Sequence, residues 1–555
     1  MKDKVKKMVE NAYAKAQVSG ELPFCQVLCE VQVEEPKAAE HGDFASNFAL
    51  TAARSLKKAP RAIAQAILAH LEDPDGILSG AEMAGPGFLN FHLKPGAWSG
   101  IVSEILLKGA AYGRSDLGKN QKVQVEFVSA NPTGPLHVGH GRGAALGDTL
   151  ARVLAFTGHD VSREYYINDS GRQISTLGNS VYLRIQELRG KKIDFPEDAY
   201  PGDYIREIAA EMERKGLVPD SVEDEAAMVL CCARYAAGVI LAGIRSDLEG
   251  FGVTYDEWYS EQSLVDRGLV EKVIADCKEK GLIYEADGAL WFATTRFGDE
   301  KDRVVMRQNG LTTYFASDIA YHMEKYERGF ARVLDVWGAD HHGYVARVSA
   351  AVQAAGHPAE AFRAVLITLV NLLRDGKPVA MGKRTGEFVT LSEVVNEVGK
   401  DAARFIFLSR HHESPLDFDL ELAKKKTNDN PVFYVQYVHA RISSISRNAA
   451  AEDLAAAERG NPDLGLLQEP EEVALMKKAG QFPEITAASA TLLEPHRITY
   501  FLMELAAAFH AYYNRHRVLG DDRELSRARL SLVLAVRQVI KNGLALLNVT
   551  APESM

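Results

Sequence analysis

Cysteine is scarce in this sequence. The 555 residues include five cysteines and no CxxC pair: Cys25, Cys29, Cys231, Cys232 and Cys277. An odd and sparse set of this kind argues against a disulfide framework and against a structural zinc site. The cluster His411, His412 and Glu413 has no further ligand at the spacing of a metal site. We therefore expect no structural metal and a reducing compartment, the cytoplasm.

A long apolar run and a secretion signal are also missing. We expect no apolar run that reaches the ~20 residues a helix needs to span a bilayer. The N-terminus, MKDKVKKMVENAYAKAQ, is typical of a charged amphipathic helix and lacks the apolar segment of a signal peptide. The sequence therefore predicts neither a membrane partner nor export.

Positive charge is in short supply as well. The sequence has 64 Lys and Arg against 75 Asp and Glu, which gives a formal net charge of −11. A strongly basic balance would indicate a nucleic-acid partner. Net charge describes the whole surface, however, whereas RNA binding needs only a local basic face. An RNA partner is therefore neither proved nor excluded, and any contact with RNA must be local.

The length of 555 residues suggests about three or four domains, and the pattern of apolar residues changes along the chain. Residues 1–113 mix strand and helix signals. GFLNFHL (87–93) alternates as a strand does, and Asp43 is placed to cap a helix that runs through FASNFALTAARSL. This pattern predicts a small α+β module, followed by the linker GRSDLGKNQ.

The next region, 120–400, contains a strand, a glycine-rich turn, a helix and another strand. KVQVEFVS is typical of a strand, GHGRGAALGDTLARVLAFTG of an amphipathic helix, and VSREYYI of a second strand. Such a βαβ unit predicts a parallel sheet with a right-handed crossover. A mostly helical insertion interrupts the pattern from about 170 to 260, and the pattern resumes at RVLDVWGADHHG.

The last part of the chain is predicted to be helical. Residues 401–429 form a connecting region, and residues 430–555 are almost all helix by their apolar spacing. The predicted architecture is therefore multidomain: an α+β N-terminal module, an α/β core with a helical insertion, and an all-α C-terminal bundle.

The strongest chemical signal is SANPTGPLHVGHGRG, in which His137 and His140 lie where a helix begins. Unpaired N–H groups at a helix N-terminus favour anions. Two imidazoles there can hydrogen-bond phosphate oxygens and stabilise charge that develops at phosphorus. Gly139 and Gly141 would let a nucleotide approach the backbone closely. The alternative is a capped helix with surface histidines.

A second signal lies in RDGKPVAMGKRTGEFVTL, residues 374–391. Lys383 and Arg384 can supply two positive charges to a pyrophosphate leaving group. By itself MGKRTG could equally be a solvated turn. Together with HVGH upstream, it predicts a phosphate-binding loop.

HVGH resembles the HIGH motif of class I aminoacyl-tRNA synthetases, which share a Rossmann-like core with small nucleotidylyltransferases. The second segment resembles the KMSK loop of the same enzymes. Met381 matches the methionine of that motif and Lys383 its second lysine, whereas Ala380 replaces the first lysine and Gly382 the serine. The loop therefore lacks one cation and one hydroxyl.

Further segments resemble bacterial-type arginyl-tRNA synthetase along the whole chain. They are GDFASNFAL, EFVSANPTGPLHVGH, REYYINDSGRQI, VWGADHHGYV, DAARFIFL, NDNPVFYVQYVHARI and VRQVIKNGLALLNVTAPESM. The resemblance implies an N-terminal module that binds the tRNA elbow, a Rossmann-like catalytic domain and a helical anticodon-binding domain.

The substrate that this resemblance implies has distinct needs. A guanidinium is a planar, permanently charged fork of donors, so its pocket requires carboxylates and other acceptors. The resemblance assigns Glu126 and Asn131 to the α-amino and carboxylate ends of arginine. It assigns Tyr314 and Asp318 to the guanidinium. The alternative for each is a cap, a core hydroxyl or a surface charge.

The loop WGADHHG is expected to complete the pocket. The resemblance places Gly338 against the ribose and base of ATP, and either Asp340 or His341 faces the arginine. The expected ATP-binding residues are thus Gly139, Gly338, Asp340, Met381 and Arg384, and His341 joins the arginine-binding set.

The C-terminal bundle is expected to contact tRNA. Tyr434, Tyr437 and Arg441 share one helix face at i, i+3 and i+7. Stacking of an aromatic ring on a base contributes about 1–3 kcal/mol, which suits an unstacked anticodon loop. A core role is the equal alternative for aromatic residues at this spacing.

The resemblance implies a two-step reaction. The arginine carboxylate attacks the α-phosphorus of Mg²⁺-bound ATP, and His137, His140 and Lys383 stabilise the charge on the phosphates. A hydroxyl of the terminal adenosine of tRNA(Arg) then attacks the arginyl-adenylate. The expected partners are L-arginine, ATP with Mg²⁺ and tRNA(Arg), and the expected oligomeric state is a monomer.

Two other readings compete with this one. A small-molecule nucleotidylyltransferase would use the same HxGH core, but it would not need the chain length or the two flanking domains. A non-catalytic, synthetase-like RNA-binding or scaffold protein would fit the altered AMGKR loop. The complete HVGH motif, Lys383 and the set of candidate arginine-binding groups argue against it.

Overall fold

A computed structural model covers the chain and describes all residues except 26–29, 37, 220–223, 380–388 and 460–461. Met381, Lys383 and Arg384 therefore lie outside the described residues. The chain divides into two compact units. Unit 1 comprises Met1–Tyr112, Ile442–Gln481 and Ala507–Val539, and unit 2 comprises Gly113–Arg441, Phe482–Ala506 and Ile540–Met555.

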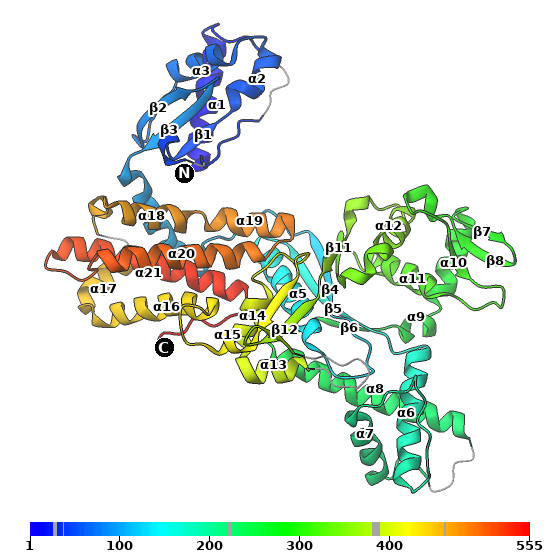
Figure 1. Cartoon of the computed structure of the whole chain (residues 1–555). Helices are drawn as coiled ribbons and strands as arrows, with labels where there is room; N and C mark the ends of the chain where they lie inside the picture. The colour runs from blue at the N-terminus through cyan, green and yellow to red at the C-terminus, as the bar shows by residue number, and fades with distance from the viewer. Residues whose placement is uncertain (26–29, 37, 220–223, 380–388, 460–461) are drawn as a thin grey trace. The chain divides into compact units, whose positions relative to one another are not determined.

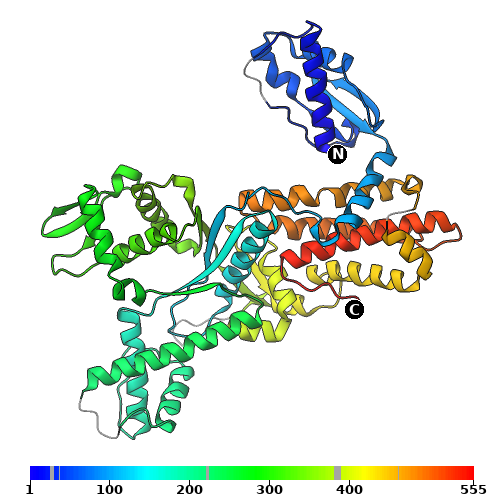
Figure 2. The same ribbon diagram turned by 180° about the vertical axis from the view of Figure 1, so that it is seen from behind.

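The N-terminal part of unit 1 is the predicted α+β module. Its antiparallel sheet has the order β1-β3-β2, and Figure 2 shows α1 in front of that sheet. The strands are β1 (Phe44–Ser46), β2 (Leu78–Ala84) and β3 (Phe88–Leu93), and the helices are α1 (Lys2–Val18), α2 (Phe48–Leu56), α3 (Pro60–Ala69) and α4 (Ser99–Lys108). Tyr13 of α1 packs edge-on against Phe48 of α2, with ring centroids 5.3 Å apart.

The predicted cap at Asp43 is wrong. Residues Phe44–Ser46 form strand β1, and the helix begins only at Phe48. The carboxylate of Asp43 instead accepts a hydrogen bond of 2.7 Å from the backbone N–H of Leu93. Pairing with β3 therefore outweighs the local capping preference, because β1 buries Phe44 in the module's core.

The C-terminal region is helical, as predicted. Its helices are α16 (Pro431–Asn448), α17 (Ala451–Glu458), α18 (Pro470–Gly480), α19 (Phe482–Leu492), α20 (His496–Arg515) and α21 (Arg523–Leu546). Helices α16, α20 and α21 each contribute residues to both units.

Unit 2 is built on a five-stranded sheet whose neighbouring strands are all parallel, in the order β11-β10-β4-β5-β6. The strands are β4 (Lys122–Phe127), β5 (Asp160–Ile167), β6 (Glu257–Ser260), β10 (Arg332–Gly338) and β11 (Phe362–Ile367). Helix α5 (Val138–Phe156) connects β4 to β5 and lies along both strands (Figure 1). The predicted βαβ unit and parallel sheet are confirmed.

A buried ion pair fixes helix α5 in unit 2. Asp148 of α5 and Arg404 of α14 (Lys400–Phe407) have fully buried side chains, and Nη2 of Arg404 lies 2.6 Å from Oδ2 of Asp148. Nε of Arg404 also donates to the backbone oxygen of Leu547. Removing one member of a buried pair typically costs about 3–5 kcal/mol, because the other charge is left uncompensated.

The helical insertion is confirmed as well, and it consists of α6 (Arg172–Leu188), α7 (Asp203–Arg214) and α8 (Glu225–Gly250). Helix α8 packs along α6. Among the described residues, α8 is the one helix long and apolar enough to cross a membrane by length and composition, with a mean hydropathy of 1.9 in its most apolar window. The expectation of no such segment overlooked it, because Arg234 interrupts the run. Helices in the cores of globular proteins meet the same criterion.

A second, smaller subdomain between β6 and β10 is absent from the sequence-based prediction. Its antiparallel sheet has the order β7-β8-β9. The elements are α9 (Gln262–Asp266), α10 (Leu269–Glu279), β7 (Ile283–Ala286), β8 (Ala289–Phe292), β9 (Arg303–Met306) and α11 (Tyr314–Glu327). Phe292 and Phe315 are buried in its core, which positions α11.

The remaining elements of unit 2 follow β10. They are η5 (Ala339–Tyr344), α12 (Val345–Ala354), β12 (Val370–Arg374), β13 (Lys377–Pro378), α13 (Leu391–Val398), β14 (Leu416–Asp419) and α15 (Leu420–Lys424). Strand β12 pairs with β13 and β14 in a separate small sheet.

Candidate active site

Three carboxylates form a row across the parallel sheet. Asp335 of β10 is in register with Glu126 of β4, and Glu126 is in register with Glu164 of β5. All three side chains are buried. Neighbouring strands lie only about 4.8 Å apart, so these like charges would repel unless cations lie among them. We call these three residues the acid row.

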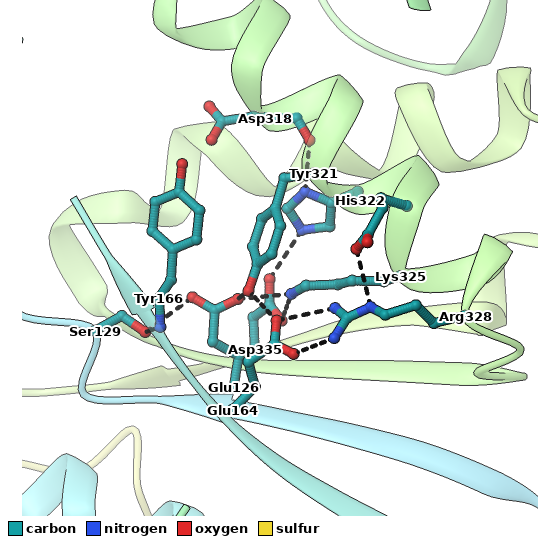
Figure 3. Close-up of polar contacts among 11 residues, drawn as sticks. Glu126, Ser129, Glu164, Tyr166, Asp318, Tyr321, His322, Lys325, Arg328 and Asp335 are labelled. Carbon is teal, nitrogen blue, oxygen red and sulfur yellow. Dashed lines mark hydrogen bonds and ion pairs between the residues drawn. The ribbon is translucent and has the colours of Figure 1, made fainter. Parts of the chain in front are cut away.

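Helix α11 supplies the groups that face the acid row. Asp318, Tyr321, His322 and Lys325 recur at i, i+3, i+4 and i+7, so they share one face of the helix. Figure 3 shows this face turned toward the side chains of the acid row, with Lys325 among the three carboxylates.

Two cations of the α11 segment neutralise part of the acid row. Nζ of Lys325, which is fully buried, donates to Oε2 of Glu126 at 2.6 Å and to Oδ1 of Asp335 at 3.1 Å. The guanidinium of Arg328, just beyond α11, donates two hydrogen bonds to Glu164. The Tyr321 hydroxyl contacts both Glu126 and Glu164, and its single proton can serve only one of them at a time.

The charges of this cluster depend on one another. Burial tends to lower the pKa of Lys325, but Asp335 and Glu126 outweigh burial and raise that pKa, so Lys325 is charged. Burial also tends to raise the pKa of Asp335, and Lys325 reverses the effect and lowers it. Burial raises the pKa of Glu126, and Lys325 opposes this rise.

A strained turn follows β4 and shapes this side of the cluster. Val128 and Ser129 have positive φ angles of 70° and 41°, although neither residue is glycine. Such backbone conformations cost of order 1–3 kcal/mol each and are concentrated at functional sites. The turn places the Ser129 hydroxyl 3.0 Å from Oε1 of Glu126, and the same hydroxyl accepts from the backbone N–H of Tyr166.

Asp318 is a half-buried carboxylate at the edge of the cluster. The hydroxyl of Tyr344, the last residue of η5, donates to its Oδ2. Burial raises the pKa of Asp318, and the Tyr344 hydrogen bond opposes that rise. Among the residues that the structure describes, no Lys, Arg or His side chain forms an ion pair with Asp318. Its charge is therefore available to a cationic ligand.

A second buried carboxylate, Glu261, lies close to Asp318. The side-chain amide of Asn168 forms hydrogen bonds when its nitrogen faces Glu261. In that orientation the Asn168 amide nitrogen donates to Oε2 of Glu261 at 2.9 Å. Burial raises the pKa of Glu261, the hydroxyl of Ser170 lowers it, and the nearby charge of Asp318 raises it further. Carboxylates thus outnumber cations in this part of the molecule, and the arrangement suits a ligand with positive charge.

Two more of the predicted arginine-binding residues, Tyr314 and Asn131, have side chains near the start of helix α6. Tyr314, the first residue of α11, is 62% exposed, and a Cβ atom on Gly171 would lie 3.5 Å from its hydroxyl. Gly171 precedes α6 and has a φ of 80°. Nδ2 of Asn131 donates to Oε1 of Gln173 on α6 at 2.5 Å.

The HVGH turn at the start of α5 holds its two imidazoles through backbone N–H groups. The N–H of Gly139 donates to Nδ1 of His137 at 3.1 Å, and the N–H of His137 donates to Nδ1 of His140 at 3.2 Å. Both Nδ1 atoms are therefore acceptors, so the proton of each neutral ring is on Nε2. The rings stack with centroids 3.7 Å apart.

The charge state of His140 follows from this packing. Burial, together with the neighbouring His137, lowers the pKa of His140 to about 3. At neutral pH this imidazole therefore acts as a hydrogen-bond donor and carries no charge.

The two glycines of this turn have different roles. A Cβ on Gly139 would meet only the ring of His137, at 2.9 Å. A Cβ on Gly141 would lie 2.6 Å from Cδ1 of Leu391 and 3.0 Å from the ring of Phe407. The structure thus corrects the expectation for Gly141, which permits close packing of α5 inside the protein and not the approach of a nucleotide.

The second motif is anchored to the first through its C-terminal flank. The N–H of Leu391 donates to the oxygen of Leu136 at 2.8 Å, and the N–H of Val138 donates to the oxygen of Val389 at 3.2 Å. These bonds place the residues directly after segment 380–388 beside the HVGH turn.

The loop after β10 is exposed where it carries the predicted residues. Gly338 ends β10, and a Cβ on it would lie 2.3 Å from Oδ1 of Asp340. Asp340 and His341 are largely exposed, with Nε2 of His341 3.6 Å from Oδ2 of Asp340. The residue of this loop that contacts Asp318 is Tyr344.

The predicted tRNA-contacting residues all lie on α16 and are half-buried: Tyr434, Tyr437 and Arg441. The guanidinium of Arg441 lies over the ring of Tyr437, 5.0 Å from its centroid, and donates to the Tyr437 hydroxyl. Burial raises the pKa of Tyr434.

Sequence reasoning missed most of the cluster behind Glu126 and Asp318. The missed residues are Glu164, Glu261, Tyr321, His322, Lys325, Asp335 and Tyr344. For three of them a signal existed: Tyr321, His322 and Lys325 continue the helical spacing that begins with Tyr314 and Asp318. No sequence signal marks the strained turn at Val128.

The fold and the site can be compared with known proteins. A family model described as "tRNA synthetases class I (R), catalytic domain" matches residues 101–413. The structure is also similar to that of Mycobacterium tuberculosis methionyl-tRNA synthetase in complex with methionyl-adenylate, with a TM-score of 0.55 over 77% of this chain and 91% of that one. At 12% identity the second likeness concerns the fold alone. The chain is thus a class I aminoacyl-tRNA synthetase.

Its relatives within that class are more specific. The chain is 57% identical to an arginine–tRNA ligase from Desulfosudis oleivorans over 100% of both chains, and 54% identical to one from Syntrophotalea carbinolica over 95% of each. The structure of Thermus thermophilus arginyl-tRNA synthetase is similar at 26% identity, with a TM-score of 0.74 over 99% of this chain and 100% of that one. The chain belongs to the arginyl-tRNA synthetase family.

Two more family models match its flanking regions. One, described as "Arginyl tRNA synthetase N terminal domain", matches residues 2–93, and the other, described as "DALR anticodon binding domain", matches residues 435–555. The resemblance and the three-part fold class derived from the sequence are confirmed.

Proposed function

We propose that this chain joins L-arginine to tRNA(Arg) in two steps, and that α11 and the acid row form its arginine pocket. The observation that carries this assignment is the excess of carboxylates over cations around Asp318, Glu261 and Glu126. Substrate arginine brings an ammonium and a guanidinium, which are the charges that such a pocket lacks. Glu126, near the end of β4, and Glu261, directly after β6, lie at the carboxyl ends of parallel strands, where open α/β sheets bind their ligands.

The two ends of arginine have separate binding groups in this assignment. Oε1 of Glu126 has one donor, Ser129, so it can still accept a hydrogen bond from the α-ammonium. Nδ2 of Asn131 has a second hydrogen besides the one directed at Gln173, which can donate to the α-carboxylate. Asp318 accepts from the guanidinium, and Tyr314 and His341 border it.

ATP binds at the HVGH turn in the same assignment. The Nε2–H groups of His137 and His140 donate to phosphate oxygens, and Gly139, which has no side chain, lets the nucleotide approach the backbone. Lys383 contacts the phosphates, with Met381 and Arg384 beside it. Gly338 and Asp340 border the ribose and base.

Magnesium enters with ATP in this assignment and neutralises charge on the departing pyrophosphate. Glu469, Glu471 and His516 are the one group within the described ranges whose ligand atoms are close enough together to hold a metal. That group belongs to unit 1, and Glu471 is already paired with Arg515 and His516. We therefore assign no protein ligands to the ion.

The first step forms arginyl-adenylate, as the substrate carboxylate attacks the α-phosphorus and pyrophosphate leaves. The neutral imidazoles stabilise charge through hydrogen bonds that strengthen as the phosphates gain charge. In the second step the 2′-hydroxyl of the terminal adenosine attacks the activated carbonyl and AMP leaves. No side chain serves as a nucleophile in either step.

The flanking domains bind the tRNA in this proposal. Residues 1–113 contact the elbow and residues 430–555 the anticodon, with Tyr434, Tyr437 and Arg441 of α16 as candidate contacts. Residues 120–400 form the catalytic domain, and 401–429 connect it to the bundle. The enzyme acts as a cytoplasmic monomer.

The arginine pocket is tested by charging tRNA(Arg) with radiolabelled arginine, comparing wild type with Asp318→Asn. The substitution removes the charge that faces the guanidinium. Loss of a hydrogen bond to a charged group costs about 1.5–3 kcal/mol, so the KM for arginine should rise about tenfold to a hundredfold while the KM for ATP stays unchanged.

Asp276→Asn, on the exposed face of α10, is the matched control and should behave as wild type. Equal arginine KM values for Asp318→Asn and wild type would refute the assignment of Asp318. Folded wild type that binds tRNA but charges no arginine would refute the reaction itself.

A further inference from the structure

A chain of buried contacts runs behind the two candidate arginine-binding carboxylates, Glu126 and Asp318. It passes from Glu126 to Lys325, then to Asp335, then to His322, and ends at the backbone of Asp318. Figure 3 shows these five residues connected in that order. The three middle side chains are at most 5% exposed, so arginine itself cannot reach them.

We propose that Lys325, Asp335 and His322 form a positioning layer that fixes both carboxylates for the two ends of substrate arginine. This inference rests on the roles of Glu126 and Asp318 proposed above. None of the three residues touches the substrate, and each acts through a residue that does.

Lys325 determines which oxygen of Glu126 is presented. Its ammonium and the Tyr321 hydroxyl both contact Oε2, whereas Oε1 has only the Ser129 hydroxyl. A carboxylate has about four lone-pair positions, so the remaining one lies on Oε1. Lys325 thereby prevents rotation of the carboxylate and keeps Oε1 available for an ammonium.

Lys325 also keeps Glu126 ionised. Glu126 is buried beside two other carboxylates, and both conditions favour its neutral form. A buried ammonium at 2.6 Å is the opposing influence. Without it Glu126 would take up a proton more readily, and a neutral carboxyl group binds an ammonium weakly.

His322 connects the same layer to Asp318. Its Nδ1 lies 2.8 Å from the backbone oxygen of Asp318, and its Nε2 lies 3.0 Å from Oδ2 of Asp335. A carbonyl oxygen can only accept, so Nδ1 must donate. The ionised Asp335 also only accepts, so both ring nitrogens of His322 face acceptors. The first turn of α11 is thereby tied to strand β10.

The consequence is a fixed relation between the two recognition points. Glu126 is on β4 and Asp318 is on α11, and the layer joins them through one strand and one helix. The distance between the carboxylates is then determined by buried charge pairs, which are less screened by salt than surface pairs. Arginine is matched at both ends because neither carboxylate moves independently.

The test compares steady-state charging by four variants, with arginine, ATP and tRNA varied in turn: Lys325→Met, Lys325→Met/Asp335→Asn, His322→Gln and Glu126→Gln. Lys325→Met leaves buried carboxylates uncompensated and can fail to fold. The double variant removes one positive and one negative charge together, so the layer keeps its net charge and the fold is retained. Thermal unfolding reports the folded state.

The matched control is Lys272→Met. Lys272 is an exposed lysine of α10 whose Nζ lies 3.5 Å from Glu327. This variant removes the same side chain from the same subdomain without touching the layer, and its KM values should equal those of wild type.

The double variant should raise the KM for arginine about tenfold or more while the KM values for ATP and tRNA stay within about twofold of wild type. The acid limb of kcat/KM for arginine should shift upward, because Glu126 loses both the charge and the hydrogen bond of Lys325, which together outweigh the loss of the repelling charge of Asp335. His322→Gln keeps the bond to Asp335, loses the one to Asp318, and should raise the KM for arginine several-fold.

Four results would overturn the proposal. Equal increases of the KM for arginine and for ATP would indicate general structural damage. An acid limb at the wild-type position in the double variant would show that Lys325 does not set the charge of Glu126. A Glu126→Gln enzyme with unchanged arginine KM would refute the role of Glu126 on which the layer depends. If Glu126→Gln impairs arginine use but the layer variants do not, the positioning role alone fails.

Discussion

The two sides of the active site handle charge by opposite means. At the HVGH turn, where an anionic nucleotide is expected, the histidines are held by backbone N–H groups, and burial makes His140 neutral. At α11, where a cationic amino acid is expected, charged groups are concentrated and acids exceed cations. In the proposed assignment the HVGH turn offers neutral hydrogen-bond donors to the anion, whereas α11 and the acid row offer full charges to the cation.

This difference between the two sides has a physical reason. Phosphates bind well to N–H groups and helix N-termini, which need no compensating charge when ATP is absent. A guanidinium requires an ionised acceptor, and an ionised acceptor in a protein interior must be held in place by other charges. This requirement agrees with the positioning layer proposed behind the carboxylates, whereas the donors of the HVGH turn need no buried counter-charge.

The largest expected effect comes from replacing His140 at the HVGH turn, the neutral half of the comparison. In His140→Asn the side-chain oxygen can replace Nδ1 as the acceptor for the His137 N–H, but the Nε2–H donor is lost. Loss of one transition-state donor typically reduces kcat by about 10²–10³-fold. We expect a loss of that order in pyrophosphate exchange measured with tRNA present, with little change in the KM for arginine.

His140→Gln is the matching variant, because its amide nitrogen can replace Nε2 while the acceptor at Nδ1 is lost. It should retain more activity than His140→Asn and be less stable to heat. The opposite ranking would mean that His140 acts mainly as a cap and not as a donor to phosphate.

The next largest effect is a pH dependence that should differ between arginine and ATP. Burial raises the pKa values of Asp318 and Glu261, and protonation removes the charges that attract a guanidinium. Arginine binding should therefore weaken as pH falls, and the loss should begin at a higher pH than for an ordinary carboxylate. The measurement is kcat/KM for arginine and for ATP between about pH 5 and 9.

The ATP profile should lack this acid limb, because His140 has a pKa of about 3 and stays neutral throughout. Bound arginine stabilises the ionised carboxylates, so the limb in kcat should lie at lower pH than the limb in kcat/KM. Identical profiles for arginine and ATP would contradict the division between a charged side and a neutral side.

The smallest effect concerns packing of the helix that carries HVGH. Gly141→Ala would force a Cβ against Leu391 and Phe407 and should cost about 1–3 kcal/mol of unfolding free energy. Gly143→Ala, on the same helix, meets nothing within 4 Å and should be neutral or slightly stabilising. Chemical denaturation measures both, and equal stabilities would show that Gly141 is not a packing requirement.

Much of the fold follows from the sequence because its signals are local. The order β4, α5, β5 can be predicted because each element has its own apolar spacing. The turn between β4 and α5 is marked by its glycine and proline residues. The subdomain of β7, β8 and β9 escaped prediction because its strands have only four residues each. The cap at Asp43 was mistaken because a long-range bond to Leu93 competes with a local preference.

The site divides in the same manner. Glu126, Asp318 and the HVGH histidines belong to recognisable motifs, so resemblance pointed to them. Glu164 and Asp335 become neighbours of Glu126 only through strand register, which a single sequence does not display. Lys325 lies seven residues after Asp318, so a helix places both on one face. Only the structure shows that this face is turned toward the acid row.

Helix α11 carries both Asp318, which we assign to the arginine pocket, and the buried cation Lys325. An engineer who wished to charge tRNA with a neutral amino acid could not simply replace Asp318. The acids that remain would still make the pocket too polar for an uncharged side chain. Removing those acids would leave the charges of Lys325 and Arg328 without partners. Several exchanges would have to occur together, each harmful alone. If these charge pairs recognise arginine as we propose, the same pairs make the substrate hard to change by one mutation at a time.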